Sequence, residues 1–110
     1  MVIKKITPRE LEGRMKGKPF VLDVRAADKF AEYHLENSHN LHKTAIFEEK
    51  DSALASLPKD KEIIVTCTTG NSAAKCAAIL ADKNYNVTLL EGGITAWKEY
   101  LREKGGNEHE

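Results

Sequence analysis

The chain has 110 residues, of which 41% are hydrophobic, so it is long enough for one domain with a modest core and too short for a second. Its 17 basic and 17 acidic residues cancel, and no basic run of five or more occurs, so charge indicates neither a nucleic-acid nor a membrane partner. No stretch approaches the roughly 20 apolar residues of a membrane span. The two cysteines do not make a disulfide scaffold, and the first residues lack the apolar core of a secretory signal, so we expect a cytoplasmic protein.

The first third of the chain predicts two strands and two helices. Residues 2–6 are predicted to form a short strand, after which Thr7 and Glu10 are expected to make a capping box that opens a helix. Residues 20–24, which are apolar except for Asp23, predict a second, buried strand, and residues 26–33 predict a short helix. This alternation is typical of α/β proteins.

Asp23 stands at the end of the second expected strand. A carboxylate at a strand terminus usually accepts backbone N–H bonds or forms an ion pair, so we interpret Asp23 as structural rather than catalytic. Arg25 and Glu32 follow within ten residues, and we expect both to belong to the same polar lattice.

The rest of the chain continues the alternation of strands and helices. Expected strands are residues 37–41, 63–65 and 87–90, and expected helices are residues 45–57, 73–83 and 94–104. Residues 105–110 have no core-forming side chain and are expected to be a mobile tail after a single domain spanning residues 1–104. Five strands alternating with helices favour an open, mostly parallel sheet with helices on both faces, whose ligand lies beyond the carboxyl ends of the strands.

Three histidines, His34, His39 and His42, lie close enough in sequence to suggest a metal site. No carboxylate or cysteine completes a recognisable ligand spacing with them. We therefore predict no metal site, and expect each histidine to be solvated or hydrogen-bonded.

The stretch from Glu62 to Lys83, EIIVTCTTGNSAAKCAAILADK, places the thiol of Cys67 between a buried strand and a helix. The first turn of a helix has N–H groups without intrahelical partners and a partial positive charge, which together stabilise an anion such as a thiolate. Gly70 allows the loop to turn successive N–H groups inward. A buried structural cysteine is the alternative, but the order strand, cysteine, small polar loop and helix favours a reactive one.

A second cysteine, Cys76, lies nine residues after Cys67, inside the expected helix. Its simplest interpretation is a small apolar residue packed beside Ala73 and Leu80. The alternative, a resolving thiol, would require a side chain in a helix interior to reach back to its own N-terminal loop.

Four segments, in chain order, carry a resemblance to a known family: LDVRAADKFAEYHL, HLENSHNL, CTTGNSA and LLEGGITAWKEYL. They resemble the Asp-x-Arg segment, the Gly-His-Ile-Pro-Gly-Ala-Ile-Asn-Ile stretch, the Cys-x-x-Gly-x-[Arg/Ser]-[Ser/Ala] active-site loop and the closing Glu-Gly-Gly-x-x-x-Trp motif of the single-domain rhodanese sulfurtransferases. Glu36, Asn37 and His39 depart from the second motif. The resemblance covers about residues 3–103 and implies a rhodanese-like α/β fold with an open, mostly parallel five-stranded sheet and helices on both faces.

The resemblance also implies an activity, that of a rhodanese-type sulfurtransferase. Such an enzyme moves a sulfane sulfur from thiosulfate or another persulfide donor to a thiol or cyanide through a persulfide, here on Cys67, and it uses no metal or organic cofactor. Loop N–H groups would bind the anionic donor, and residues at strand ends would face the same crevice and support the loop. The expected substrate-binding residues are Thr68, Thr69, Gly70, Asn71 and Ser72, and the expected supporting residues are Asp23, Arg25 and Glu91.

Loop length separates this chemistry from that of cysteine phosphatases. These use a wider Cys-x5-Arg loop, in which the arginine clamps two phosphate oxygens. Here the loop spans Cys67 to Ser72, and no arginine occurs between Arg25 and Arg102. We therefore expect no phosphatase activity, and we expect anion binding to rest on neutral donors, with Lys75 either adding charge or lying solvated on the helix.

The non-enzymatic alternative is a rhodanese-like binding or regulatory module, or a persulfide carrier that exchanges sulfur with a protein partner. Members of the family that act only as modules usually lack the cysteine. The presence of Cys67 therefore favours the enzyme.

Overall fold

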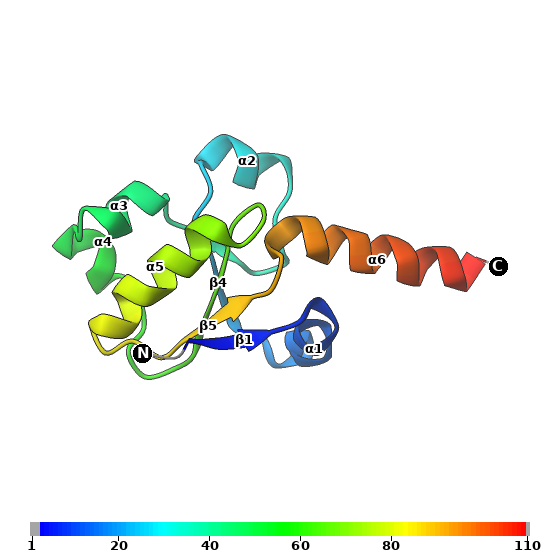
Figure 1. Cartoon of the computed structure of the whole chain (residues 1–110), viewed down its shortest axis with the longest axis horizontal. Helices are drawn as coiled ribbons and strands as arrows, with labels where there is room; N and C mark the ends of the chain where they lie inside the picture. The colour runs from blue at the N-terminus through cyan, green and yellow to red at the C-terminus, as the bar shows by residue number, and fades with distance from the viewer. Residues whose placement is uncertain (1–2, 110) are drawn as a thin grey trace.

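The computed structural model describes residues 3–109, and the side chains of residues 3–105. It contains one five-stranded sheet with the strand order β1-β5-β4-β2-β3, in which every neighbouring pair is parallel. The strands are β1 (Lys4–Ile6), β2 (Phe20–Asp23), β3 (His39–Asn40), β4 (Ile63–Thr66) and β5 (Val87–Leu90). The predicted open, mostly parallel sheet is therefore present, and all five strands end at the edge that carries the cysteine loop (Figure 1).

Helices cover both faces of this sheet (Figure 1). The α-helices are α1 (Pro8–Arg14), α2 (Ala27–Glu32), α3 (Lys43–Phe47), α4 (Asp51–Ala55), α5 (Asn71–Asp82) and α6 (Gly93–His109), and the 3₁₀ helix η1 (Met15–Gly17) follows α1. No helix in the described part of the chain is long and apolar enough to cross a membrane.

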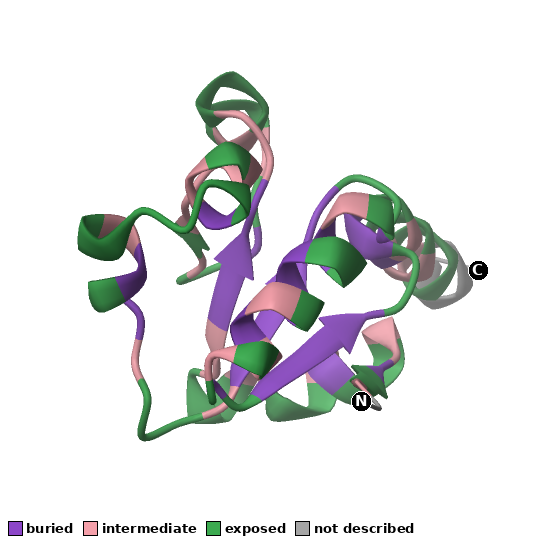
Figure 2. Ribbon diagram, turned by 60° about the vertical axis from the view of Figure 1, so that its left-hand side comes forward, coloured by how far each residue is buried: buried purple, intermediate pink, exposed green. Residues whose placement is uncertain are grey.

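The core is divided by the sheet into two clusters, and neighbouring strand residues point into opposite ones. In β4, Ile63 and Val65 pack with α3, α4 and α5, whereas Ile64 packs with α1 and α6. Both β4 and β5 are buried along their whole length, as Figure 2 shows. Burial on both faces explains why the sequence shows continuous apolar runs at these strands instead of an alternating pattern.

One predicted element is wrong: residues 45–57 do not form a single helix. The structure has α3 and α4 instead, separated by Glu48–Lys50. Glu49 has a φ of 51°, a left-handed conformation that ends a helix. Because Ile46 and Leu54 are both buried in the same core cluster, their apolar spacing imitates one continuous helix.

The last helix is longer than predicted. It begins at Gly93 and continues past Lys104 to His109, whereas the sequence suggested residues 94–104. The single domain and the mobility of residues 105–110 stay predictions.

Candidate active site

The thiol of Cys67 lies in a cup of backbone N–H groups. Cys67 directly follows β4, and α5 begins four residues later at Asn71. Its Sγ accepts hydrogen bonds from the N–H of Gly70 at 3.1 Å and of Ala73 at 3.3 Å. Gly70 has a φ of 101°, a conformation that only glycine adopts easily, and this turns its N–H toward the sulfur. The cup therefore stabilises negative charge on the sulfur through fixed dipoles.

The N-terminus of α6 holds the same loop from the other side. Ile94 N–H donates to the Cys67 carbonyl at 2.8 Å, and Thr95 N–H donates to the Thr68 carbonyl at 2.9 Å. Gly93, with a φ of 62°, makes this approach possible, because a Cβ at that position would lie 2.4 Å from the Cys67 carbonyl oxygen. The Gly-Gly pair of the closing motif thus serves to seat α6 against the cysteine loop.

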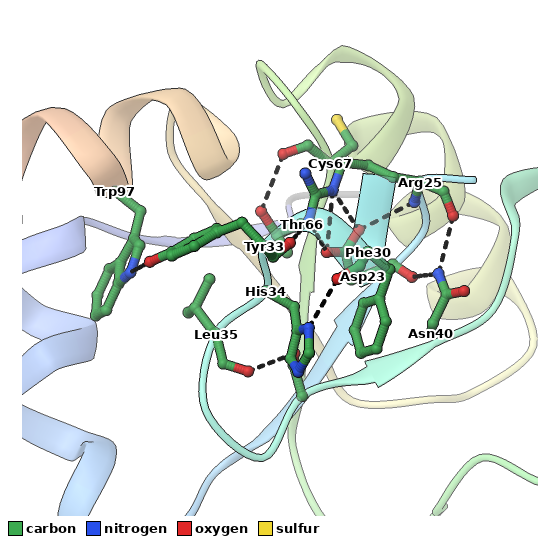
Figure 3. Close-up of polar contacts among 11 residues, drawn as sticks. Asp23, Arg25, Phe30, Tyr33, His34, Leu35, Asn40, Thr66, Cys67 and Trp97 are labelled. Atoms are coloured by element: carbon green, nitrogen blue, oxygen red, sulfur yellow. Dashed lines mark hydrogen bonds and ion pairs between the residues drawn. The ribbon is translucent and has the colours of Figure 1, made fainter. Parts of the chain in front are cut away.

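Asp23 and Arg25 form an ion pair next to the loop (Figure 3). The Asp23 carboxylate is fully buried and accepts from Arg25 Nη2 at 2.7 Å, and Nη2 also donates to the Tyr33 carbonyl at 2.6 Å. Asn40 Nδ2 donates to the carbonyls of both Asp23 and Arg25, which ties β3 to the end of β2. Figure 3 shows the Cys67 sulfur pointing away from this pair. The pair therefore anchors the neighbouring strand ends, and the guanidinium is already engaged.

Glu32 does not belong to this polar lattice, contrary to our expectation. Its carboxylate lies 3.7 Å from Lys29 Nζ, and both side chains are exposed on α2. Glu32 lines a hollow together with Arg25, but its ion pair is with Lys29 and not with the Asp23–Arg25 pair.

A cavity of about 370 Å³ opens beside Cys67. The loop lines one part of it, and cationic side chains from outside the loop line another. The loop residues are Cys67, Thr68, Thr69, Asn71 and Ser72, and the cationic residues are Arg25, Lys29 and Lys43. The cavity thus combines a thiol, backbone dipoles and positive charge, which is suited to a small anion.

Three predicted site residues, Gly70, Asp23 and Glu91, do not line this cavity. Gly70 takes part through its N–H, which donates to Cys67 Sγ. Glu91 is exposed and lines a separate hollow with Lys5, on the far side of Gly70 and Asn71. The expectation that Glu91 faces the same crevice as Cys67 is therefore wrong, because β1 and β5 lie on the other side of the loop from β2. Asp23 is buried and reaches the cavity only through Arg25.

Lys43, which the sequence did not suggest, places an ammonium group at the end of the loop. Its Nζ lies 3.5 Å from Ser72 Oγ, and no carboxylate lies within 4 Å of it among the described residues. Lys75, by contrast, is exposed on α5 and does not line the cavity. Lys43 therefore adds a cation to a cavity in which the sequence analysis expected anion binding to rest on neutral donors. The signal was available: Lys43 follows β3, a strand that ends at the same edge as β4.

Cys76 is fully buried, in the same core cluster as Ala73 and Leu80. Burial raises the pKa of the Cys76 thiol to about 12, and a negative Cys67 adds to the rise. Cys76 therefore stays a protonated thiol at neutral pH. This geometry favours the packing interpretation over the resolving thiol.

The three histidines have separate partners. His34 Nδ1 hydrogen-bonds the Phe30 carbonyl at 2.7 Å, and the ring of His39 stacks on that of Phe20 at 4.3 Å. His42 Nδ1 caps the N-terminus of α3. Over the described residues, no group of three or more His, Cys, Asp or Glu side chains is placed to hold a metal ion.

Comparison with known proteins agrees with this fold. Residues 7–100 match the model of the Rhodanese-like domain family. The thiosulfate sulfurtransferase GlpE of Pseudomonas savastanoi pv. phaseolicola is 30% identical over 98 residues, which cover 86% of this chain and 87% of GlpE. The probable adenylyltransferase/sulfurtransferase MoeZ of Mycobacterium tuberculosis is 29% identical over 100 residues, although the chain spans only 25% of its length.

Among solved structures, a rhodanese-related protein from Thermoplasma volcanium is similar with a TM-score of 0.78 and 30% identity, over 88% of this chain and 92% of that one. The family match covers the first three segments that carried the resemblance and all of the fourth except Leu101. The chain therefore belongs to the Rhodanese-like domain family.

Proposed function

We propose that the protein is a sulfurtransferase that moves a sulfane sulfur from thiosulfate, or another persulfide donor, to a thiol or cyanide through a persulfide on Cys67. One observation carries the proposal: Cys67 Sγ accepts two backbone N–H bonds beside a cavity with cationic walls. The similarity to proteins named thiosulfate sulfurtransferase supports it.

In the first step, the Cys67 thiolate attacks the outer sulfur of thiosulfate. A new S–S bond forms, and the bond between the two thiosulfate sulfurs breaks with its electron pair leaving on sulfite. One thiolate and one dianion thus become one persulfide anion and one dianion, so charge is conserved. The N–H groups of Gly70 and Ala73 stabilise the attacking thiolate, and Lys43 neutralises part of the donor's charge.

In the second step, the acceptor attacks the terminal sulfur of the persulfide. The bond between this sulfur and Cys67 Sγ breaks, and its electron pair returns to Sγ. The same N–H groups that first held the thiolate receive this charge again, so the cup serves both half-reactions. Neither step requires a metal or an organic cofactor.

Steady-state kinetics test this function. Thiocyanate formation from thiosulfate and cyanide should give parallel double-reciprocal lines, since each product leaves before the next substrate reacts. p-Nitrophenyl phosphate should not be hydrolysed above background, because the loop is short and lacks an arginine at its end. Folded protein that forms no thiocyanate, or that hydrolyses the phosphate ester only when Cys67 is intact, would overturn the proposal.

Lys43 gives a prediction about donor binding. The substitution Lys43→Gln should raise the KM for thiosulfate about tenfold, corresponding to roughly 1.4 kcal/mol, because a half-buried cation beside the dianion is lost. The value of kcat should change less, since the interaction already exists in the bound ground state. Lys75→Gln removes an exposed lysine from α5 and is the matched control. Equal KM values for the two variants would show that Lys43 does not bind the donor.

A protein donor or acceptor is the second candidate. The similarity to MoeZ, whose name joins adenylyltransferase and sulfurtransferase, favours persulfide exchange with a protein partner. The rates of Cys67 persulfide formation from thiosulfate and from a protein persulfide distinguish an enzyme that uses a small donor from a carrier that uses a protein donor. A protein donor that reacts faster at equal concentration would favour the carrier.

A further inference from the structure

We propose that a second cavity, between α2, the cysteine loop and α6, binds a carboxylate of the acceptor, so that the protein prefers small thiols that carry carboxylate groups. The inference rests on the proposed sulfur transfer and concerns only its second half-reaction. It assigns Lys98 of α6 as the group that recognises the carboxylate.

The second cavity measures about 230 Å³ and adjoins the first. Arg25, Lys29 and Thr68 line both cavities, so the two meet at these residues. Beyond them, Thr95 and Lys98 of α6 form the outer wall. Lys43 lines only the first cavity. A molecule whose sulfur reacts at Cys67 can therefore extend past Thr68 into the second cavity while the Lys43 side stays free.

Positive charge in this second cavity exceeds its negative charge. The Arg25 guanidinium is paired with buried Asp23. Glu32 also lines the cavity, and its carboxylate lies 3.7 Å from Lys29 Nζ, so these two charges offset each other. Lys98 has no carboxylate within 4 Å among the described residues, which leaves one cation without a counter-ion. In a chain whose charges cancel overall, this local excess favours an anionic ligand.

Lys98 is exposed and contacts an aromatic ring, and its ammonium group makes no hydrogen bond with the described residues. Its Nζ lies 4.6 Å from the centroid of the Tyr33 ring, a cation–π arrangement. Tyr33 is itself fixed, because its hydroxyl accepts a hydrogen bond of 2.9 Å from Trp97 Nε1 (Figure 3). An ammonium group carries three N–H donors and no acceptor, so Lys98 can donate to a carboxylate while it stays on the ring. The hydroxyls of Thr68 and Thr95 line the same cavity and can add neutral donors.

The chemistry of transfer leaves this carboxylate unchanged. The acceptor thiolate forms a bond to the terminal sulfur of the persulfide, and the bond from that sulfur to Cys67 Sγ breaks with its electron pair on Sγ. The product is the persulfide of the acceptor, and the protein returns to the thiolate. The role of Lys98 is therefore to bind and orient the acceptor, and the first half-reaction does not involve it.

The test compares acceptors on the persulfidated full chain. Protein treated with thiosulfate and desalted is mixed with 3-mercaptopropionate, mercaptosuccinate or 2-mercaptoethanol, and loss of the persulfide is followed by mass spectrometry. For each thiol, the transfer rate of Lys98→Gln is divided by that of the wild-type chain, because this ratio cancels the thiol's own reactivity. Lys75→Gln, an exposed lysine that lines neither cavity, is the matched control.

At thiol concentrations below saturation, we expect Lys98→Gln to slow transfer to the two carboxylate thiols about fivefold, and to slow transfer to 2-mercaptoethanol less than twofold. Persulfide formation from thiosulfate should not change. Equal losses for charged and neutral thiols, or no loss for either, would overturn the subsite while leaving the proposed function intact. Failure of the wild-type chain to form a persulfide would instead overturn the proposed function, and the subsite with it.

Discussion

Replacing Cys67 by serine is expected to reduce sulfur transfer to background while the protein stays folded. A serine hydroxyl does not ionise near neutral pH and cannot form the persulfide. The fold should persist, because the Cys67 Sγ accepts two hydrogen bonds from the described residues and a serine hydroxyl can accept from the same N–H groups. Thiocyanate formation measures the activity, and thermal unfolding of the variant checks the fold.

Cys76→Ala is the matched control for this substitution. Cys76 has a pKa of about 12, so it is a neutral thiol below that pH and supplies no nucleophile in an assay at pH 7 to 9. The variant should keep most of the activity and lose about 1 kcal/mol of stability from a small cavity. A folded Cys76→Ala protein as inactive as Cys67→Ser would contradict a mechanism that uses one thiol.

The second large effect is expected for Gly93→Ala, which should destabilise the protein by roughly 3–5 kcal/mol. Its Cβ would lie 2.4 Å from the Cys67 carbonyl oxygen and 2.7 Å from the Thr68 carbonyl oxygen, both backbone atoms, in a residue whose φ is 62°. Relief requires α6 to move away from the loop, and this breaks the hydrogen bonds from Ile94 and Thr95. Sulfur transfer should fall as well, because the loop loses its support.

Gly13→Ala serves as the control for Gly93→Ala in urea unfolding. Apart from its chain neighbours and the nearby backbone of its own helix, no described atom lies within 4 Å of a Cβ built at Gly13, which is inside α1. Alanine favours a helix interior over glycine by about 1 kcal/mol, so this variant should be slightly more stable than the wild-type chain. If Gly93→Ala kept wild-type stability and activity, the close seating of α6 on the cysteine loop would be wrong.

Much of the fold was predictable because its signals are local. Runs such as Ile63 to Val65 show no alternation, since the sheet buries both faces, and Thr7 with Glu10 forms the predicted capping box. The break between α3 and α4 was not predictable in the same way. It depends on a left-handed Glu49, whereas glycine or asparagine is the usual marker of that conformation.

In the candidate site, too, the features with a local sequence signal were predictable and the others were not. The order strand, Cys67, Gly70 and helix lies within a few residues, so the sequence indicated the thiol and its loop. Lys43 follows a predicted strand, and that position could have indicated it. Lys98 reaches its cavity from α6, and only the three-dimensional arrangement brings it there. The second N–H donor to the sulfur comes from Ala73, one residue beyond the predicted loop, because the first turn of α5 curls back over Cys67.

The most direct test of the proposed function is the intact mass of the protein after incubation with thiosulfate and removal of small molecules. The wild-type chain should gain about 32 Da, one sulfur, and lose it again on treatment with cyanide or dithiothreitol. Peptide mapping should place the added sulfur on Cys67, and the Cys67→Ser protein should show no gain. An unchanged wild-type mass, or added sulfur on Cys76 instead, would contradict the Cys67 persulfide.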